Sequence, residues 1–237
     1  AKDAKAHMQI WIDNATAAAD DDFCFISFDN ATLAEFYNTR SANGDSVAFS
    51  YKKLSTVAHE LYKNNKEAAF HSFDILVNSA ATAGAFGGQL TVKLPYDRAL
   101  TPSANAETRV YVLNGNERES VASSVSNGYV SFAAPHFSDY VISNEYRINV
   151  LFQDKNGNAV VDGCTASEPF MPAGATVQID SLFTYPTDRY VLDSVTVSAG
   201  TLNGNVFTMP ESAVTVTVTL KPVSYRVYYY VNGTLYG

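Results

Sequence analysis

The feature that most constrains this chain is a two-residue alternation of apolar and polar side chains. Residues 214–220 read VTVTVTL, and residues 89–94 read QLTVKL. Because successive side chains of a strand point to opposite faces, each run predicts a strand with one buried face. Further β-prone runs occupy residues 23–28, 47–51, 73–77, 109–113, 128–132 and 146–152. The sequence therefore predicts a mainly β protein.

Two segments favour short helices instead. Residues 31–37 follow Asn30, which is suited to an N-cap. In residues 55–66, Ser55 can serve as the cap, and one helix face would carry Val57, Ala58, Leu61 and Tyr62. We expect both helices in the first of several modules.

A change of composition predicts a domain boundary. The apolar run at residues 140–142 is followed by Ser143, Asn144 and Glu145, which we interpret as a polar linker. The predicted modules are residues 1–144, a β-rich module with a short helical insert, and residues 145–221, a small β domain. Tyr-Arg-Val at 225–227 repeats Tyr-Arg-Ile at 146–148, so we expect residues 222–237 to be the first strand of a further module.

The expected architecture is a tandem array of β-sandwich or β-grasp-like modules, each large enough to bury its own core. The chain has no initiator Met and stops inside an apparent strand. We interpret it as an internal piece of a longer polypeptide.

Charge and hydropathy exclude several partners. The net charge is −8, only 17% of residues are charged, and Lys and Arg form no cluster. These values argue against nucleic acid or an anionic membrane as the main partner. The sequence also lacks a run of about 18 apolar residues, so no membrane insertion is expected. Cys24 and Cys164 lie in different predicted modules, and we expect two buried free thiols.

The histidines do not form a catalytic or metal-binding pattern. His136 lies near Ser138 and Asp139, but it follows Pro135 at the start of a strand and not at a nucleophile turn, so we expect a structural hydrogen-bonding role. His59-Glu60 lacks the second His of a zinc-protease helix, because Lys63 occupies that position, and we expect a solvated face there. His7 and His71 have no ligand partners at a suitable spacing.

Two acidic segments are candidate cation-binding sites. Asp154, Asn156, Asn158 and Asp162 alternate like calcium ligands, but Ala159 and Thr165 replace the required Gly and Glu, which favours a plain Asn-Gly turn. Residues 20–22 are all Asp and are interpreted as a solvated loop. The sequence therefore predicts no catalytic residue, no cofactor and no metal site, and we expect no enzyme.

Aromatic residues make up 13% of the chain, with 15 Tyr. Exposed aromatic rings can stack on sugars or anchor a protein partner, but packing within the sheets is the interpretation that we favour for each. The residues considered for such contacts are Trp11, Tyr37, Tyr62, Tyr228 and Tyr230. Lys93 is a conceivable donor for an isopeptide crosslink, without an identifiable acceptor.

Residues 171–220 resemble the divergent internalin-type B-repeat modules of bacterial surface proteins. The resemblance rests on YVLDSVTV at residues 190–197, similar to the family's D-S-V-T-V strand, and on NGNVFTMP at 203–210, similar to its T-F-T-M-P signature. Phe207 and Met209 are expected to point to one face, with a tight turn at Asn203-Gly204.

Residues 86–96 (FGGQLTVKLPY) and 129–142 (YVSFAAPHFSDYVI) resemble a β-rich module of long surface proteins from Gram-positive anaerobes. That module closes with an H-F-S-x-Y-V-I strand and often lies beside cell-wall attachment modules. Together the two resemblances imply an extracellular location, secreted or attached to the cell wall.

The implied function is a non-catalytic segment of a large bacterial cell-surface protein, with a role in adhesion, in host-protein binding or as a stalk. The expected partner is a host or neighbouring-cell protein or glycan, bound by a monomer through edge strands and the 55–66 helix. The alternative is a carbohydrate-binding accessory module of a secreted multidomain enzyme.

Overall fold

A computed structural model of the chain describes residues 7–11, 23–28, 31, 47–54, 59–62, 68–77, 80–82, 85–95 and 106–236. The protein is mainly β, with 61% strand and 3% helix, which confirms the predicted fold class. The chain forms two compact units. Unit 1 comprises Ala1–Tyr146 with Pro172–Ala175, and unit 2 comprises Arg147–Met171 with Thr176–Gly237.

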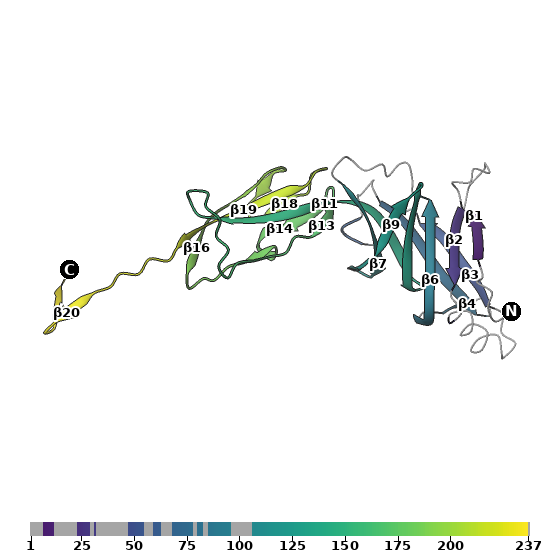
Figure 1. Cartoon of the computed structure of the whole chain (residues 1–237), viewed down its shortest axis with the longest axis horizontal. Helices are drawn as coiled ribbons and strands as arrows, with labels where there is room; N and C mark the ends of the chain where they lie inside the picture. Colours follow the sequence, from purple (N-terminus) through teal and green to yellow (C-terminus); the bar gives the residue numbers. More distant parts are fainter. Residues whose placement is uncertain are drawn as a thin grey trace. The chain divides into compact units, whose positions relative to one another are not determined.

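Unit 1 contains two antiparallel sheets (Figure 1). The first has the strand order β1-β2-β6-β10-β9, formed by β1 (His7–Trp11), β2 (Phe23–Phe28), β6 (Ala85–Pro95), β10 (Tyr129–His136) and β9 (Ser123–Ser126). The second has the order β3-β4-β11-β7-β8, with β5 paired to β4; its strands are β3 (Val47–Leu54), β4 (Ala68–Val77), β5 (Ala80–Thr82), β7 (Glu107–Asn114), β8 (Glu117–Val121) and β11 (Asp139–Gln153).

The two sheets of unit 1 pack face to face. Strand β6 buries Leu90, Val92 and Leu94 and leaves Thr91 exposed, as its alternating sequence predicts. The ring of Phe132 on β10 lies 5.2 Å from the ring of Tyr140 on β11, centroid to centroid, which joins the two layers. Unit 1 is therefore a β-sandwich-like unit.

The outer face of the second sheet is also covered. A second apolar cluster lies there, made of Tyr62, Phe70, Tyr111, Leu113 and Val141. Val141 stands opposite both Tyr111 of β7 and Phe70 of β4 in the strand register. As a result, β11 is buried on both faces within unit 1.

The polar linker predicted at Ser143, Asn144 and Glu145 is wrong. These residues lie within the continuous strand β11 and are fully buried. Their backbone pairs with β7, where Glu145 stands opposite Glu107. The Thr108 hydroxyl donates to Asn144 Oδ1 over 2.9 Å. Because both the backbone and the side chains find partners, a polar sequence is accommodated in a strand interior.

The predicted helices fall mostly outside the described residues. Of residues 31–37 only Ala31 is described, in helical conformation. Of residues 55–66 the structure describes His59 to Tyr62, which form one turn in which the Tyr62 N–H donates to the His59 carbonyl over 3.0 Å.

Unit 2 is built on a sheet in which the later part of β11 pairs with β13 and β19, and β19 pairs with β16. These strands are β13 (Phe170–Pro172), β16 (Tyr190–Val197) and β19 (Val214–Pro222). Smaller sheets join β12 (Thr165–Ala166) to β15 (Phe183–Thr184), and β14 (Thr176–Gln178) to β18 (Val206–Thr208) and β17 (Leu202–Asn203), with a 3-10 turn η4 (Ile179–Ser181). A hairpin of β20 (Tyr229–Val231) and β21 (Thr234–Tyr236) follows.

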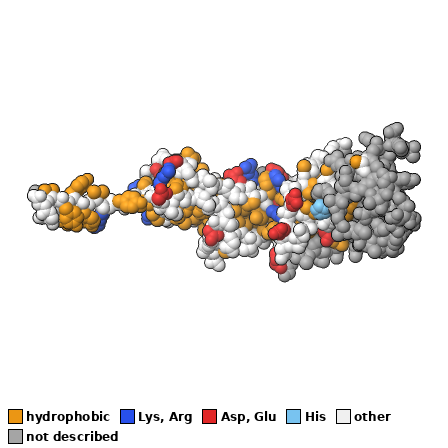
Figure 2. All heavy atoms as spheres, turned by 90° about the horizontal axis from the view of Figure 1, so that it is seen from below, with side chains coloured by type: hydrophobic (Ala, Val, Ile, Leu, Met, Phe, Trp, Pro, Cys, Tyr) orange, Lys and Arg blue, Asp and Glu red, His pale blue; other side chains and the backbone are white. Residues whose placement is uncertain are grey.

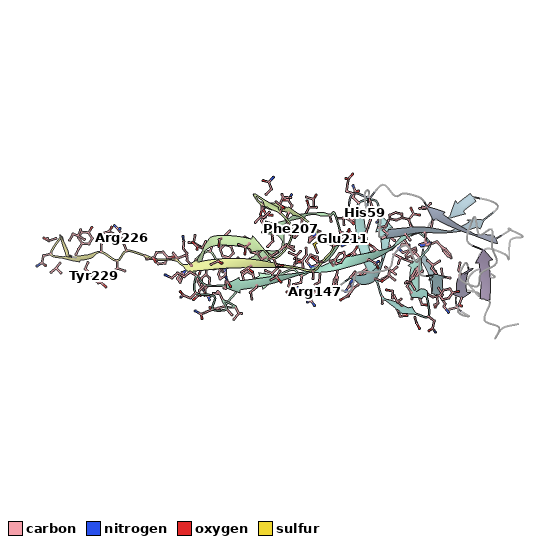
Figure 3. The ribbon with its side chains drawn as sticks, turned by 90° about the horizontal axis from the view of Figure 1, so that it is seen from above. His59, Arg147, Phe207, Glu211, Arg226 and Tyr229 are labelled. Atoms are coloured by element: carbon pink, nitrogen blue, oxygen red, sulfur yellow. The ribbon has the colours of Figure 1, made fainter. Side chains whose placement is uncertain are left out.

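The core of unit 2 follows the sequence pattern closely. On β19 the valines and Leu220 are buried and the threonines between them are half-buried, in the expected alternation. Phe207, labelled in Figure 3, and Met209 are both buried, which confirms the prediction for the NGNVFTMP segment. Gly204 has a φ of +62°, which the tight turn between β17 and β18 requires. Among the residues that the structure describes, no helix is long and apolar enough to cross a membrane.

Removing the Phe207 ring tests this core. Phe207→Ala is expected to lower the free energy of unfolding of unit 2 by about 3–5 kcal/mol, because the cavity adds to the lost burial. Urea denaturation followed by circular dichroism measures the change. Val161→Ala, at a side chain that is 78% exposed, should stay within about 0.5 kcal/mol. A loss below about 1 kcal/mol for Phe207→Ala would contradict the assignment.

Candidate functional site

The most concentrated polar chemistry in the described residues is a buried ion pair in unit 1. Glu145 of β11 has an exposure of 0%, and Arg118 of β8 lies with Nη1 2.5 Å from Glu145 Oε1. Strand register explains why the Arg118 and Glu145 side chains come together. Arg118 stands opposite Leu113 and so shares its face of the sheet, and Leu113 lies on the same outer face as Val141. Glu145 shares that face with Val141 by alternation.

Two tyrosine hydroxyls complete what we call the Glu145 cluster: Glu145, Arg118, Tyr62 and Tyr111. The Tyr62 hydroxyl donates to Glu145 Oε1 over 3.0 Å, and the Tyr111 hydroxyl donates to Oε2 over 2.7 Å. The Arg118 guanidinium also lies 4.1 Å above the Tyr111 ring centroid, a cation–π distance. Both carboxylate oxygens are thus satisfied from within unit 1.

Burial and charge act against each other in this cluster. Burial raises the pKa of Glu145, while Arg118 and the two hydroxyls oppose the rise. Burial also raises the pKa of Tyr62 and of Tyr111, and the Glu145 charge raises both further, so the hydroxyls stay protonated and donate. Because the Glu145 carboxylate is inaccessible to solvent, its hydrogen bonds must come from within the protein, and the cluster supplies them.

His59 packs beside this cluster. The side chain is buried, and its ring lies 5.1 Å from the Tyr62 ring, centroid to centroid. The backbone N–H of Leu61 donates to His59 Nδ1 over 3.3 Å, which places the ring proton on Nε2 in the neutral form. The expectation of a solvated face is therefore wrong for His59 and correct for Glu60, which is exposed.

His136 ends β10, with Nδ1 3.4 Å from the Phe137 carbonyl oxygen, and its expected structural role stays a prediction. The Tyr140 hydroxyl donates to the His136 carbonyl over 2.5 Å. Ser138 Oγ donates to the Leu113 carbonyl over 3.4 Å, so it is not positioned as a nucleophile for the histidine. His71 is buried within β4.

The Asp154 segment forms a turn stabilised by its own aspartate. Asp154 Oδ1 accepts the N–H groups of Asn156 at 2.7 Å and Asn158 at 2.9 Å, and Oδ2 accepts the Asn158 amide at 2.9 Å. These donors hold the pKa of Asp154 below its usual range. Asp162 pairs with Arg189 instead of joining the turn. In the described part of the chain, no three His, Cys, Asp or Glu side chains converge as metal ligands would.

Other candidate residues are placed as follows. Cys164 is a free thiol but only half-buried, which corrects the expectation of full burial. The Lys93 ammonium lies 4.4 Å above the Tyr129 ring centroid. Asp20, Asp21, Asp22 and Tyr37 lie outside the described residues, as do the side chains of His7, Trp11 and Cys24.

The aromatic candidates divide into buried and exposed residues. Tyr62 is buried in the Glu145 cluster and is no contact residue. Tyr228 and Tyr230 are 54% and 65% exposed, as are their neighbours Tyr225, Val227, Tyr229, Val231 and Leu235 to similar degrees. Figure 2 shows hydrophobic side chains along this C-terminal stretch, and Figure 3 labels Tyr229 and Arg226 on it. We call residues 225–235 the tyrosine segment.

Sequence reasoning missed the Glu145 cluster. Its hydrogen bonds join residues 27, 34 and 83 positions apart, so no local spacing reveals it. The one usable signal is alternation, because Val141, Ser143 and Glu145 continue a strand face beyond the apolar run.

The buried pair should be far more costly to break than an exposed one. Arg118→Met leaves a buried carboxylate without its cation and is expected to destabilise unit 1 by about 3–5 kcal/mol. The matched control is Lys221→Met, which removes an exposed pair with Asp193 at 3.2 Å and should cost under about 1 kcal/mol. Urea denaturation measures both. Equal costs would contradict the structural role of the cluster.

Low pH is expected to lower the free energy of unfolding of unit 1, because His59 is buried in it. Burial lowers the pKa of His59, and the Arg118 charge lowers it further, although Glu60 and the Asn116 backbone oppose this. The folded state therefore binds the proton less readily than the unfolded state, whose pKa is about 6.5. Stability from this group is present above that value and is lost as the pH falls below it.

The urea midpoint of unit 1 should therefore decline between pH 7.5 and pH 5, and His59→Gln should reduce that decline. His136→Gln serves as the control and should keep it. If His59→Gln leaves the pH dependence unchanged, the histidine does not carry the effect.

The chain was compared with known proteins. No protein-family model matches it, and no curated protein sequence matches it. The resemblances to surface-protein modules therefore stay predictions.

Proposed function

We propose that the chain is a non-catalytic segment of a large bacterial cell-surface protein, acting in adhesion to a host or neighbouring-cell protein or as a stalk. The observation that carries the proposal is the arrangement of polar groups. In the described residues the main polar cluster is buried and internally satisfied, while each unit has its own apolar core. This combination suits a display or adhesion module better than an enzyme.

The sequence resemblances support the extracellular part of the proposal. Unit 2 contains the segments that resemble a divergent internalin-type B-repeat, and unit 1 contains those that resemble the H-F-S-x-Y-V-I module. An extracellular location, secreted or attached to a Gram-positive cell wall, belongs to the same proposal.

The tyrosine segment is the contact surface that we favour for a protein partner. Tyrosine is enriched among residues that dominate binding energy, because it offers a large rigid ring and a hydroxyl. Tyr228, Tyr229 and Tyr230 are all more than half exposed, whereas the tyrosines of unit 1 whose burial the structure describes are buried or half-buried. Their rings are therefore accessible without rearrangement of a core.

A second function is favoured by one specific observation. Tyr228 directly precedes β20 and Tyr230 lies within it, and the side chains of Tyr228, Tyr229 and Tyr230 are 54%, 66% and 65% exposed. Neighbouring exposed aromatic rings are the kind of side chain on which a sugar can stack. The alternative proposal is a carbohydrate-binding accessory module of a secreted multidomain enzyme.

A binding screen distinguishes these proposals. The whole chain is tested by interferometry against a glycan panel, mucins, immunoglobulins and extracellular-matrix proteins. For adhesion we expect saturable binding to a protein, weakened at least about tenfold by Tyr228→Ser with Tyr230→Ser, since that factor is about 1.4 kcal/mol. Val161→Ser, at another exposed apolar side chain, is the control and should bind like the parent chain.

The other outcomes are informative as well. If a glycan binds the parent chain but not the double tyrosine variant, the result would support the carbohydrate-binding alternative and contradict adhesion to a protein. No binding to any member of the panel would contradict the adhesive role and leave the stalk.

A further inference from the structure

In unit 2, β19 and the later part of β11 are parallel neighbours. Their register pairs Ile148 with Val214 and continues without a shift to Gln153 with Thr219. Figure 1 shows the two strands side by side along unit 2. The chain therefore enters unit 2 on one strand of this pair and leaves its core on the other.

This arrangement fixes how tension along the chain would act. The chain enters unit 2 within β11, at Arg147, which Figure 3 labels and which is the amino end of the part of β11 in this unit. It leaves at the carboxyl end of β19, at Pro222. In a parallel pair these two ends lie at opposite ends of the ladder. Pulling on them slides one strand along the other, so all inter-strand hydrogen bonds are loaded together. Pulling on two ends at the same end of the ladder would instead open the bonds one after another.

The apolar core resists the same sliding movement. Ile148 and Phe152 of β11 and the valines of β19 at 214, 216 and 218 are all buried on the inner face. Moving either strand along its neighbour would expose these apolar side chains to water, which is unfavourable. β19 is also paired on its other edge with β16, where Val195 stands opposite Val218.

Both ends of the pair are fastened to other parts of unit 2. At the start of β11, Arg147 forms an ion pair with Glu168 over 2.6 Å, and Glu168 also accepts the Val150 N–H over 3.3 Å. After β19, the Val223 N–H donates to the Arg189 carbonyl over 2.7 Å, and the Tyr225 hydroxyl donates to the Asp188 carbonyl over 3.1 Å.

We propose that the β11–β19 pair is a mechanical clamp that lets unit 2 withstand tension applied along the chain. The clamp goes beyond the proposed function, because it depends on strand geometry and not on any ligand. It gives a surface-attached segment, whether adhesin or stalk, the capacity to remain folded under load.

Single-molecule force spectroscopy with two pulling directions tests the clamp. Both proteins are the full chain carrying Cys24→Ser and Cys164→Ser. In the first, handles at the two chain ends load β11 and β19 in shear. In the second, handles at Lys155→Cys and at the C-terminal end pull from the same end of the ladder, since Lys155 is exposed in the turn after β11. Unfolding of unit 2 is recognised by a gain in contour length of roughly 25 nm in the first protein, from residues 148–219, and roughly 22 nm in the second, from residues 155–219.

At equal loading rate, we expect unit 2 to unfold at a several-fold higher force in the first direction than in the second. Equal forces, or a lower force in the shear direction, would overturn the clamp. The urea midpoint of unit 2 should be the same in both proteins, which shows that direction and not stability causes the difference. Because no ligand takes part, failure here would leave the proposed function standing, and failure of the binding screen would leave the clamp standing.

Discussion

The structure depends on the backbone pairing of one strand, β11. In unit 1 its residues 139–145 hydrogen-bond to β7, and residues 139–143 to β4, and in unit 2 its residues 148–153 pair with β19. Between Tyr140 and Tyr146 every side chain is buried, so any polar residue there needs a partner inside the protein. That requirement explains why Glu145 is held by Arg118 and two tyrosine hydroxyls, and why the segment at 59–62, which supplies one of them, lies against the sheet.

The sequence pattern predicts the strands with a single buried face. β6 and β19 alternate in sequence and in burial alike, and the Asn203-Gly204 turn and the buried Phe207 and Met209 follow from local chemistry. The same reasoning fails at residues 143–145, because Ser, Asn and Glu are typical of a linker, and the groups that satisfy them come from distant parts of the chain. It fails for His59 for the same reason: its burial is decided by the sheet beneath it and not by its neighbours in sequence. Tyr62, which the sequence places on the apolar face of residues 55–66, is buried as expected.

The candidate site shows the same division. From the sequence, Tyr62, Tyr228 and Tyr230 are candidates for aromatic contacts with packing within the sheets favoured for each, and nothing in their local pattern separates them. Tyr62 fills an apolar cluster beside Glu145, whereas the two later tyrosines are exposed. The difference depends on tertiary structure, because a tyrosine ring stays exposed only where no other part of the fold covers it. The parallel pairing of β11 with β19 could not be predicted from the sequence either, because an alternating pattern does not determine the direction of a strand within its sheet.

The central claim is that β11 is the strand on which each unit depends, and native-state hydrogen exchange tests it most directly. Amides with the highest protection report the part of a unit that opens only on global unfolding. The account predicts that the amides of Val141 and Ile142 are among the slowest in unit 1, and that those of the paired part of β11 are among the slowest in unit 2. If the β11 amides exchanged as fast as those of the exposed strand β9, the account would be contradicted.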